Sequence, residues 1–221
     1  MDPNRYQGIG MTSRRTRERL VSRLAEEGIR DPRVLQAILE VPRHLFVDEA
    51  LASRAYDNTP LPIGHGQTIS QPWVVARMTE LLIEQSIPER VLELGTGSGY
   101  QAAVLAYLGV EVYTIERIKA LADQARQRMR DLRLHRVHVR YGDGSEGWAQ
   151  HAPYQGIIVT AAPEEVPDPL WDQLDEGGRL VAPLGGAGRP QELVLIERVD
   201  GELRRRHVAS VSFVPLLGGC R

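Results

Sequence analysis

The segment VLELGTGSGY carries the strongest chemical signal in the chain, because Gly95, Gly97 and Gly99 follow a short apolar run and precede a helical pattern. Glycines beyond the end of a buried strand let the backbone turn tightly and approach a ligand without an intervening side chain. Glu116 ends the next apolar run, about 20 residues further on, where a carboxylate can accept hydrogen bonds from both hydroxyls of a ribose. The spacing therefore predicts a site for a cofactor that contains a ribose.

The spacing of the glycines also narrows the class of cofactor. A dinucleotide fingerprint requires G-x-G-x-x-G, whereas this loop reads G-x-G-x-G with Tyr100 in the sixth position. A P-loop requires Gly-Lys-Ser or Gly-Lys-Thr, and the sequence contains neither. We therefore expect S-adenosylmethionine, which carries a ribose and no phosphate.

Other residues are expected at the same edge of the sheet. Glu93 lies inside the strand before the loop, so its carboxylate is expected near the amino acid moiety of the cofactor or near the loop amides; the alternative is a buried carboxylate that only satisfies backbone donors. Asp143 and Gly144 are expected beside the adenine, although an Asp-Gly pair after a strand is also a common turn. Thr160 is expected where the methyl group is presented. The residues after it do not form the Pro-Pro-aromatic motif of enzymes that methylate amino groups of DNA bases.

A second polar stretch, LPIGHGQTISQPWVV, runs from Leu61 to Val75. It gathers two glycines, Thr68 and Ser70, with no acidic cluster and no strong base beside them. His65 is expected to bind substrate, with an exposed loop histidine of no function as the alternative.

The elements that must position these residues alternate between strand and helix, which predicts an α/β fold with a mostly parallel, doubly wound sheet. Added helices are expected before this core, from Thr12 or Ser13 to Gly28, from Asp31 to Val41 and from Pro72 onwards, with irregular structure over 43–62. The last two strands, over 192–198 and 202–214, are expected to be antiparallel. The core strands are expected at 90–94, 111–116, 136–141, 154–162 and 178–185, with helices at 99–109 and 119–132.

One domain is expected over residues 1–221. Its expected parts are a flexible lead-in (1–11), an N-terminal cap on the substrate side (12–72), a cofactor-binding core (73–190), and C-terminal strands with a substrate-side arm (191–221).

Composition excludes several classes of function. The 27 basic and 29 acidic side chains leave a net charge of −2, which gives no electrostatic footprint for nucleic acid or an anionic membrane. The one cysteine, Cys220, excludes an intramolecular disulfide and a cysteine-based metal site. With no apolar run long enough to cross a bilayer and no secretion signal, we expect a cytoplasmic protein without a metal. A monomer is expected, although the sequence does not determine the oligomeric state.

Several motifs, in order, give the chain a resemblance to one family: VPRHLFV, LPIGHGQTISQP, VLELGTGSGYQAAVLA, VYTIERI, GDG, IIVTAAP, LDEGGRLVAPLG and VSFVPL. From about Thr12 to Leu217 the chain resembles protein-L-isoaspartate (D-aspartate) O-methyltransferases. The resemblance implies a Rossmann-like fold that uses S-adenosylmethionine and releases S-adenosylhomocysteine. The methyl group would go to the free α-carboxylate of L-isoaspartyl residues in damaged proteins and peptides, with D-aspartyl residues left open. The lead-in and Trp73 depart from the family pattern.

The resemblance also implies roles for the second polar stretch. Thr68, Ile69 and Ser70 would lie over the methyl group, with Ser70 as the catalytic residue that also contacts substrate. No base is required, because a carboxylate with a pKa near 4 is already ionised at neutral pH. Val214 would lie along the substrate backbone, and Leu217 would approach the cofactor.

Two alternatives stay open from the sequence. One is a small-molecule carboxyl or O-methyltransferase on the same fold. The other is a protein-interaction module that binds the cofactor without turnover.

Overall fold

The structure, a computed structural model, describes residues 8, 10–185, 188 and 190–221. The lead-in predicted for residues 1–11 falls mainly outside this described part, in which Gly10–Thr12 form a short 3-10 helix, η1. Within the described residues, no helix is both long enough and apolar enough to span a bilayer.

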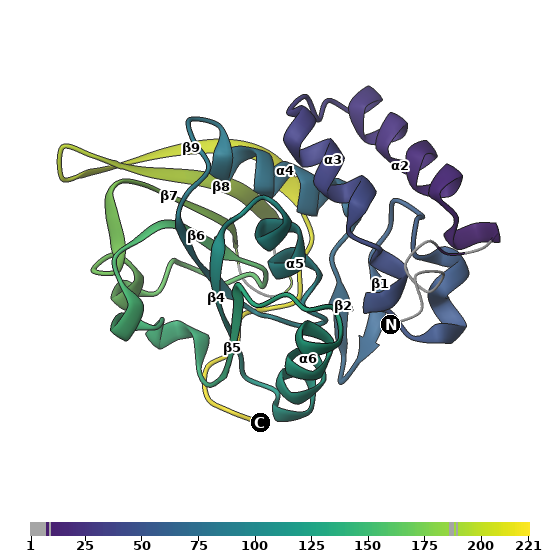
Figure 1. Cartoon of the computed structure of the whole chain (residues 1–221). Helices are drawn as coiled ribbons and strands as arrows, with labels where there is room; N and C mark the ends of the chain where they lie inside the picture. The colour runs from purple at the N-terminus through teal and green to yellow at the C-terminus, as the bar shows by residue number, and fades with distance from the viewer. Residues whose placement is uncertain (1–7, 9, 186–187, 189) are drawn as a thin grey trace.

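A seven-stranded mixed sheet forms the centre of the fold (Figure 1). Its strands lie in the order β5-β4-β3-β6-β7-β8-β9. The first five in this order run parallel to one another, and β8 and β9 are antiparallel to their neighbours. This arrangement confirms the predicted fold class. The strands are β3 (Arg90–Leu94), β4 (Glu111–Glu116), β5 (Val137–Tyr141), β6 (Tyr154–Val159), β7 (Leu174–Leu184), β8 (Gln191–Val199) and β9 (Glu202–Val211).

The position of β3 in the sheet determines where a ligand can bind. After β3 the chain runs outward to β4 and β5, and it then returns to β6 on the other side of β3. The strand order therefore reverses between β3 and β6, and open parallel sheets bind ligands beyond the carboxyl ends of their strands at such a point. Gly95, Glu116 and Thr160 all lie at this edge, at the ends of β3, β4 and β6.

The helices begin at residues that favour helix starts. Asp31 caps one of them, because its carboxylate accepts a hydrogen bond from the Arg33 amide at 2.8 Å. Pro72 is the first residue of another, a position where the missing N–H has no partner to lose. The α-helices of the described part are α2 (Arg14–Glu26), α3 (Pro32–Glu40), α4 (Pro72–Ile83), α5 (Tyr100–Tyr107) and α6 (Lys119–Asp131).

Both faces of the sheet are buried, by different layers. Side chains alternate between the faces, so Val91 joins one apolar cluster with residues of α2 to α5, whereas Leu92 joins a second cluster. The second cluster includes Leu170, which lies in a short 3-10 helix that connects β6 to β7, on the opposite face of the sheet. The 3-10 helices of these and other connections are η2 (Arg43–Phe46), η3 (Glu49–Arg54), η4 (Gly144–Glu146), η5 (Ala149–His151) and η6 (Asp168–Leu170).

A small hairpin is the main element that the sequence did not predict. β1 (Leu61–Gly64) and β2 (Gln67–Ile69) pair antiparallel and turn at His65 and Gly66, which both have positive φ, 54° and 71°. Such a two-residue turn matches the twist of a hairpin. The hairpin presents the second polar stretch to the carboxyl edge of the large sheet.

Candidate active site

The glycine loop after β3 is shaped by positions that only glycine fills without strain. Gly95, Gly97 and Gly99 have φ of 96°, 51° and 86°, in the left-handed region that side chains disfavour. A Cβ at Gly95 would also lie 2.6 Å from Thr160 Oγ1. The loop therefore presents backbone amides, with little side-chain bulk, above the end of β3.

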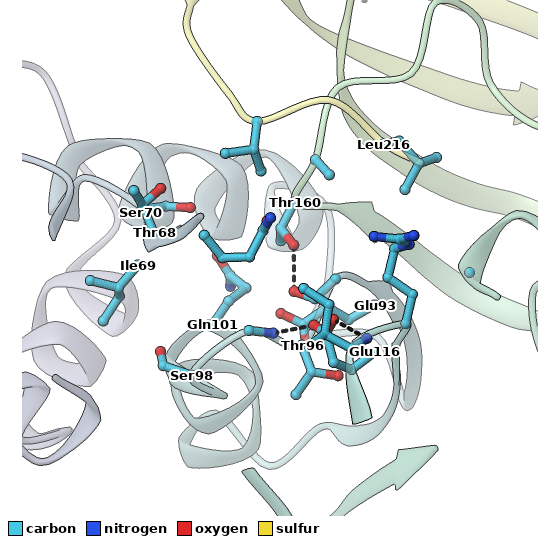
Figure 2. Close-up of a pocket in the computed structure, with 18 of the residues that line it drawn as sticks. Thr68, Ile69, Ser70, Glu93, Thr96, Ser98, Gln101, Glu116, Thr160 and Leu216 are labelled. Atoms are coloured by element: carbon cyan, nitrogen blue, oxygen red, sulfur yellow. Dashed lines mark hydrogen bonds between the residues drawn. The ribbon is translucent and has the colours of Figure 1, made fainter. Parts of the chain in front are cut away.

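The Glu116 carboxylate lies beside this loop, as Figure 2 shows. One oxygen accepts a hydrogen bond from the Gly97 amide at 2.8 Å, and the other accepts one from the Ile118 amide at 2.9 Å. Glu116 is only 5% exposed, so these charge-assisted bonds offset part of the cost of burial. The two amides fix the carboxylate in one orientation, with lone pairs left for a ligand.

Glu93 is the most unusual group in the site. It is fully buried, and neither carboxylate oxygen has a hydrogen-bond partner among the described residues. Burial raises the pKa of Glu93 to about 8, and the nearby charge of Glu116 adds to the shift. The Thr114 hydroxyl opposes it, although in the structure that hydroxyl pairs with Thr96 Oγ1 at 2.6 Å. An unpartnered buried carboxylate at a cavity wall fits a ligand that carries a cationic or donor group.

The residues of the hairpin face the glycine loop across a cavity (Figure 2). Ile69 is buried and anchors the hairpin, whereas Thr68 is exposed and Ser70 is half-buried. Within the described part of the chain, the Ser70 hydroxyl has no protein hydrogen-bond partner. Ser70 also lies just before α4, whose amino end carries a partial positive charge.

This first cavity brings together most of the predicted cofactor-binding residues: Thr68, Ile69, Ser70, Glu93, Gly95, Gly97, Glu116, Gly144, Thr160 and Leu217. Its walls come from distant parts of the chain, at residues 67–70, 95–98, 115–118 and 214–217. An amide-lined loop, a carboxylate oriented by two amides and an unpartnered buried carboxylate match the donor set expected for S-adenosylmethionine.

A second cavity, of about 530 Å³, lies beside the first and shares Thr68, Ser70, Thr160 and Val214 with it. Its other walls come from Pro60, from Gln71, Trp73 and Val74, and from residues 210–213. The volume falls within the usual range for ligand sites. Ser70 and Thr160 therefore lie at the junction of two cavities, where a group from one can meet a group from the other.

Asp143 is not among the residues that line either cavity. Its carboxylate accepts hydrogen bonds from the Ser145 amide and hydroxyl and from the amide of Gly219, near the end of the chain. Burial raises the pKa of Asp143, but these hydrogen bonds outweigh it and the pKa is lowered. The adenine contact predicted for Asp143 stays a prediction, whereas Gly144 does line the first cavity.

Three other predicted residues differ in their placement. His65 lies at the exposed turn of the hairpin and lines neither cavity. Val214 lines both cavities, but its carbonyl accepts the Ala162 amide at 2.7 Å, which leaves only its N–H for a substrate backbone. Leu217 lines the first cavity and is 50% exposed.

The sequence reading missed several residues of the cavities. Thr96 and Ser98 lie within the glycine loop, and their polar character between glycines was a usable signal. Gln101 is buried on the first turn of α5 and donates to Thr79 Oγ1 at 2.9 Å. The family resemblance places the segment SFVPLL, which contains Ser212 and Phe213, along the substrate cleft, and both residues line the second cavity; no local pattern indicated Gln71 or Ser210.

Metal ligation has no candidate here: the described residues contain no group of three or more His, Cys, Asp or Glu side chains that could hold an ion.

Comparison with known proteins adds a family to this geometry. The family model for protein-L-isoaspartate(D-aspartate) O-methyltransferase matches residues 15–221. A protein-L-isoaspartate O-methyltransferase from Halorhodospira halophila is 66% identical over 212 residues, which cover 96% of each chain. The enzyme of the same name from Stenotrophomonas maltophilia is 60% identical and covers 96% of this chain and 93% of its own.

Solved structures agree with the sequence comparisons. A protein-L-isoaspartate O-methyltransferase superposes with a TM-score of 0.84 at 30% identity over 91% of this chain and 66% of its own. A structure from Plasmodium falciparum, described as a protein-L-isoaspartate O-methyltransferase in complex with S-adenosyl-L-homocysteine, gives a TM-score of 0.78 at 25% identity and covers 91% of this chain and 98% of its own. The fold, the two joined cavities and these matches together place the chain in the protein-L-isoaspartate(D-aspartate) O-methyltransferase family.

Proposed function

We propose that this chain aligns the α-carboxylate of an isoaspartyl residue at the junction of its two cavities, and that the Ser70 hydroxyl holds the carboxylate there. As a member of its family, the chain is a methyltransferase that repairs isoaspartyl residues in proteins. The observation that carries the proposal is the position of Ser70, which lines both cavities and has a hydroxyl without a partner in the described chain.

The first cavity would hold S-adenosylmethionine, which when bound supplies an electrophilic methyl group on a sulfonium. Glu116 would accept the ribose hydroxyls, because its carboxylate is already oriented by the Gly97 and Ile118 amides. Glu93 would face the ammonium of the methionine moiety, which would supply the partner that its oxygens lack. Gly144 would contact the adenine, with Asp143 beside it.

Ser70 needs no general base for this reaction. The attacking oxygen belongs to a carboxylate with an ordinary pKa near 4, so it is ionised at neutral pH. What the chain must supply is placement, and well-oriented partners lower a barrier by up to about 7–11 kcal/mol. A hydroxyl that binds one carboxylate oxygen leaves the other oxygen free to attack.

Neutral donors suit this chemistry better than a cation would. The positive charge of the sulfonium and the negative charge of the carboxylate cancel as the methyl group moves. A cationic side chain bound to the carboxylate would therefore stabilise the starting state more than the transition state. Ser70, Thr68 and the amino end of α4 offer hydroxyls and a partial charge only. The Val214 N–H would pair with the substrate backbone, and His65 would contact the substrate outside the cavities.

The test is Ser70→Ala, with Ser22→Ala on the exposed side of α2 as the matched control. Initial rates are measured with an isoaspartyl peptide and its aspartyl twin. We expect kcat to fall on the order of 100-fold in Ser70→Ala, as for a misplaced reacting group. The dissociation constant for S-adenosylhomocysteine should change little, and the control should match the wild type.

Two results would contradict the proposal. One is a wild-type rate in Ser70→Ala. The other is a kcat of the unmodified chain that climbs steeply between pH 6 and 8 at saturating cofactor, because a titrating base would then be required. Equal methylation of the aspartyl twin, or of free small carboxylates, would instead indicate a small-molecule enzyme, and cofactor binding without ester formation would indicate an interaction module.

We also propose that the chain acts as a monomer, since both cavities are lined by residues of one chain. Light scattering during size-exclusion chromatography tests this directly. Action in the cytoplasm stays a prediction from the sequence.

A further inference from the structure

Trp73 lines the second cavity, and both its indole and its backbone amide are held by hydrogen bonds. Its Nε1 donates to the Glu27 carbonyl at 3.2 Å, and its backbone amide donates to Asn58 Oδ1 at 2.9 Å. Asn58 in turn donates to Glu27 Oε2 at 2.6 Å. Trp73 therefore has a fixed orientation, because its side chain is hydrogen-bonded to the end of α2 and its backbone to the segment before the hairpin.

A second segment of the cavity lining, at Phe213, is fixed as well. Phe213 donates its amide to Gln191 Oε1 at 2.6 Å and accepts a hydrogen bond on its carbonyl from Gln191 Nε2 at 3.2 Å. Gln191 is itself 6% exposed, so this backbone pairing is shielded from water. Two aromatic residues on separately anchored segments thus line one cavity.

The cavity is also free of charge. Among the described residues that line it, none has an ionisable side chain; the polar ones are hydroxyls and one amide. Pro60, Val74 and Val211 add to the apolar surface of the two aromatics. A charged side chain would lose water there without gaining a partner, whereas an apolar side chain would bury its surface favourably.

We infer that Trp73 is a specificity-determining residue that selects an uncharged, apolar or aromatic side chain next to the isoaspartyl residue of the substrate. The inference rests on the proposed function, because it requires the α-carboxylate to bind at Ser70, which lines the same cavity. A neighbouring residue of an extended chain then reaches the aromatic wall, since successive residues advance by about 3.3 Å. Hydrogen bonds to the substrate main chain do not depend on its sequence. Contact with Trp73 makes kcat/KM depend on the residue next to the isoaspartyl residue.

The experiment uses isoaspartyl peptides that differ at one position. Gly, Phe or Glu is placed directly before or directly after the isoaspartyl residue, and kcat/KM is measured for each. For the wild type, at one of the two positions, we expect the Phe peptide to exceed the Gly peptide by about tenfold and the Glu peptide to be the poorest. Trp73→Ala should bring the Phe-to-Gly ratio to within about twofold of one, and Trp73→Phe should retain most of the ratio.

Tyr107→Ala is the matched control, because Tyr107 is an aromatic residue at the end of α5 that is 46% exposed and lines neither cavity. It should keep both the wild-type activity and the ratio. Binding of S-adenosylhomocysteine shows whether each variant is folded. If Trp73→Ala does not fold, Trp73→Gln, which replaces the aromatic surface with an uncharged polar side chain, takes its place with the same expected loss of the ratio.

A wild-type ratio near one at both positions would overturn the inference, and so would a tenfold ratio that survives in Trp73→Ala. These outcomes are separable from a failure of the proposed function. If Ser70→Ala kept full activity, the alignment role would be lost, whereas the neighbour preference would be measured in enzyme with intact Ser70.

Discussion

The Asp143 carboxylate accepts a hydrogen bond from the amide of Gly219, which ties the loop after β5 to the end of the chain. The same tail pairs with the loop after β4, where the Arg117 carbonyl accepts a hydrogen bond from the Arg221 amide at 2.7 Å. Arg117 Nε donates to the Gly219 carbonyl at 3.0 Å. The last residues thus bridge the two loops expected to hold the ribose and the adenine, and Figure 1 shows the C-terminus near β5 and α6.

Removal of residues 218–221 should therefore weaken cofactor binding. Each surface hydrogen bond contributes modestly, so we expect the dissociation constant of S-adenosylhomocysteine to rise by about 3- to 10-fold in calorimetric titrations. Cys220→Ser keeps the backbone contacts and should bind as the wild type does. Unchanged affinity after truncation would show that the tail does not support the site.

Glu116→Ala should weaken the cofactor far more than the peptide. It removes the ribose acceptor and leaves the Gly97 and Ile118 amides without their charged partner, so we expect a loss of about 30-fold or more in cofactor affinity. The KM for peptide should change by less than about threefold. Glu111→Ala, at the other end of β4, is the control, and equal losses for both ligands would refute the ribose assignment.

The buried carboxylate of Glu93 should make stability depend on pH. Its pKa is raised from 4.5 to about 8 in the folded chain, so the folded state holds a proton that the unfolded state releases. This contribution to stability is fully present below about pH 4.5 and is lost as the pH rises through about 8. Urea unfolding without cofactor should show a decline over this window that is absent in Glu93→Gln; parallel pH profiles for the two proteins would refute it.

Cofactor binding should release a proton from the same residue. An ammonium group beside Glu93 would favour the ionised carboxylate and lower its pKa, so near pH 7 binding would expel the proton. The binding enthalpy of S-adenosylmethionine should then vary with the ionisation enthalpy of the buffer. Glu93→Gln should remove that variation, and a buffer-independent enthalpy in the wild type would place the ammonium elsewhere.

Gly95→Ala should cost more stability than a comparable change elsewhere. Gly177 has a positive φ of 73° with open space around it, so Gly177→Ala isolates the backbone strain, at about 1 kcal/mol. At Gly95 the added methyl also meets Thr160 Oγ1, and we expect a total of about 3 kcal/mol in urea unfolding. Adding Thr160→Ala to Gly95→Ala should recover part of the lost free energy of unfolding. Equal losses at positions 95 and 177 would show that the contact with Thr160 does not lower stability.

The cofactor side of the site could be predicted from sequence because its signals are local. β4 extends from Glu111 to Glu116, as predicted, since a run of β-branched and aromatic residues bounded by charged residues favours a buried strand. The glycine loop comes directly after β3 and Glu116 is the last residue of β4, so the pairing of these two strands brings them together.

The substrate side was harder because its contacts join distant segments. β1 and β2 are only four and three residues long, and their one local sign is the turn at His65 and Gly66. Asp143 and Gly219 are 76 positions apart, and no periodicity relates them. β7 begins at Leu174, four residues before its predicted start, because pairing with β6 extends it through a bulge.

The contact between position 95 and the Thr160 hydroxyl also limits how this family of sequences can drift. A variant that loses the hydroxyl would free space above Gly95, yet the left-handed backbone would still reject a new side chain there. The Thr160 hydroxyl and the positive φ each disfavour a side chain at position 95, so a change at one neighbouring residue does not make the substitution favourable. A side chain at position 95 would require two changes together, one at residue 160 and one in the backbone of the loop, so glycine should persist there through single substitutions of its neighbours.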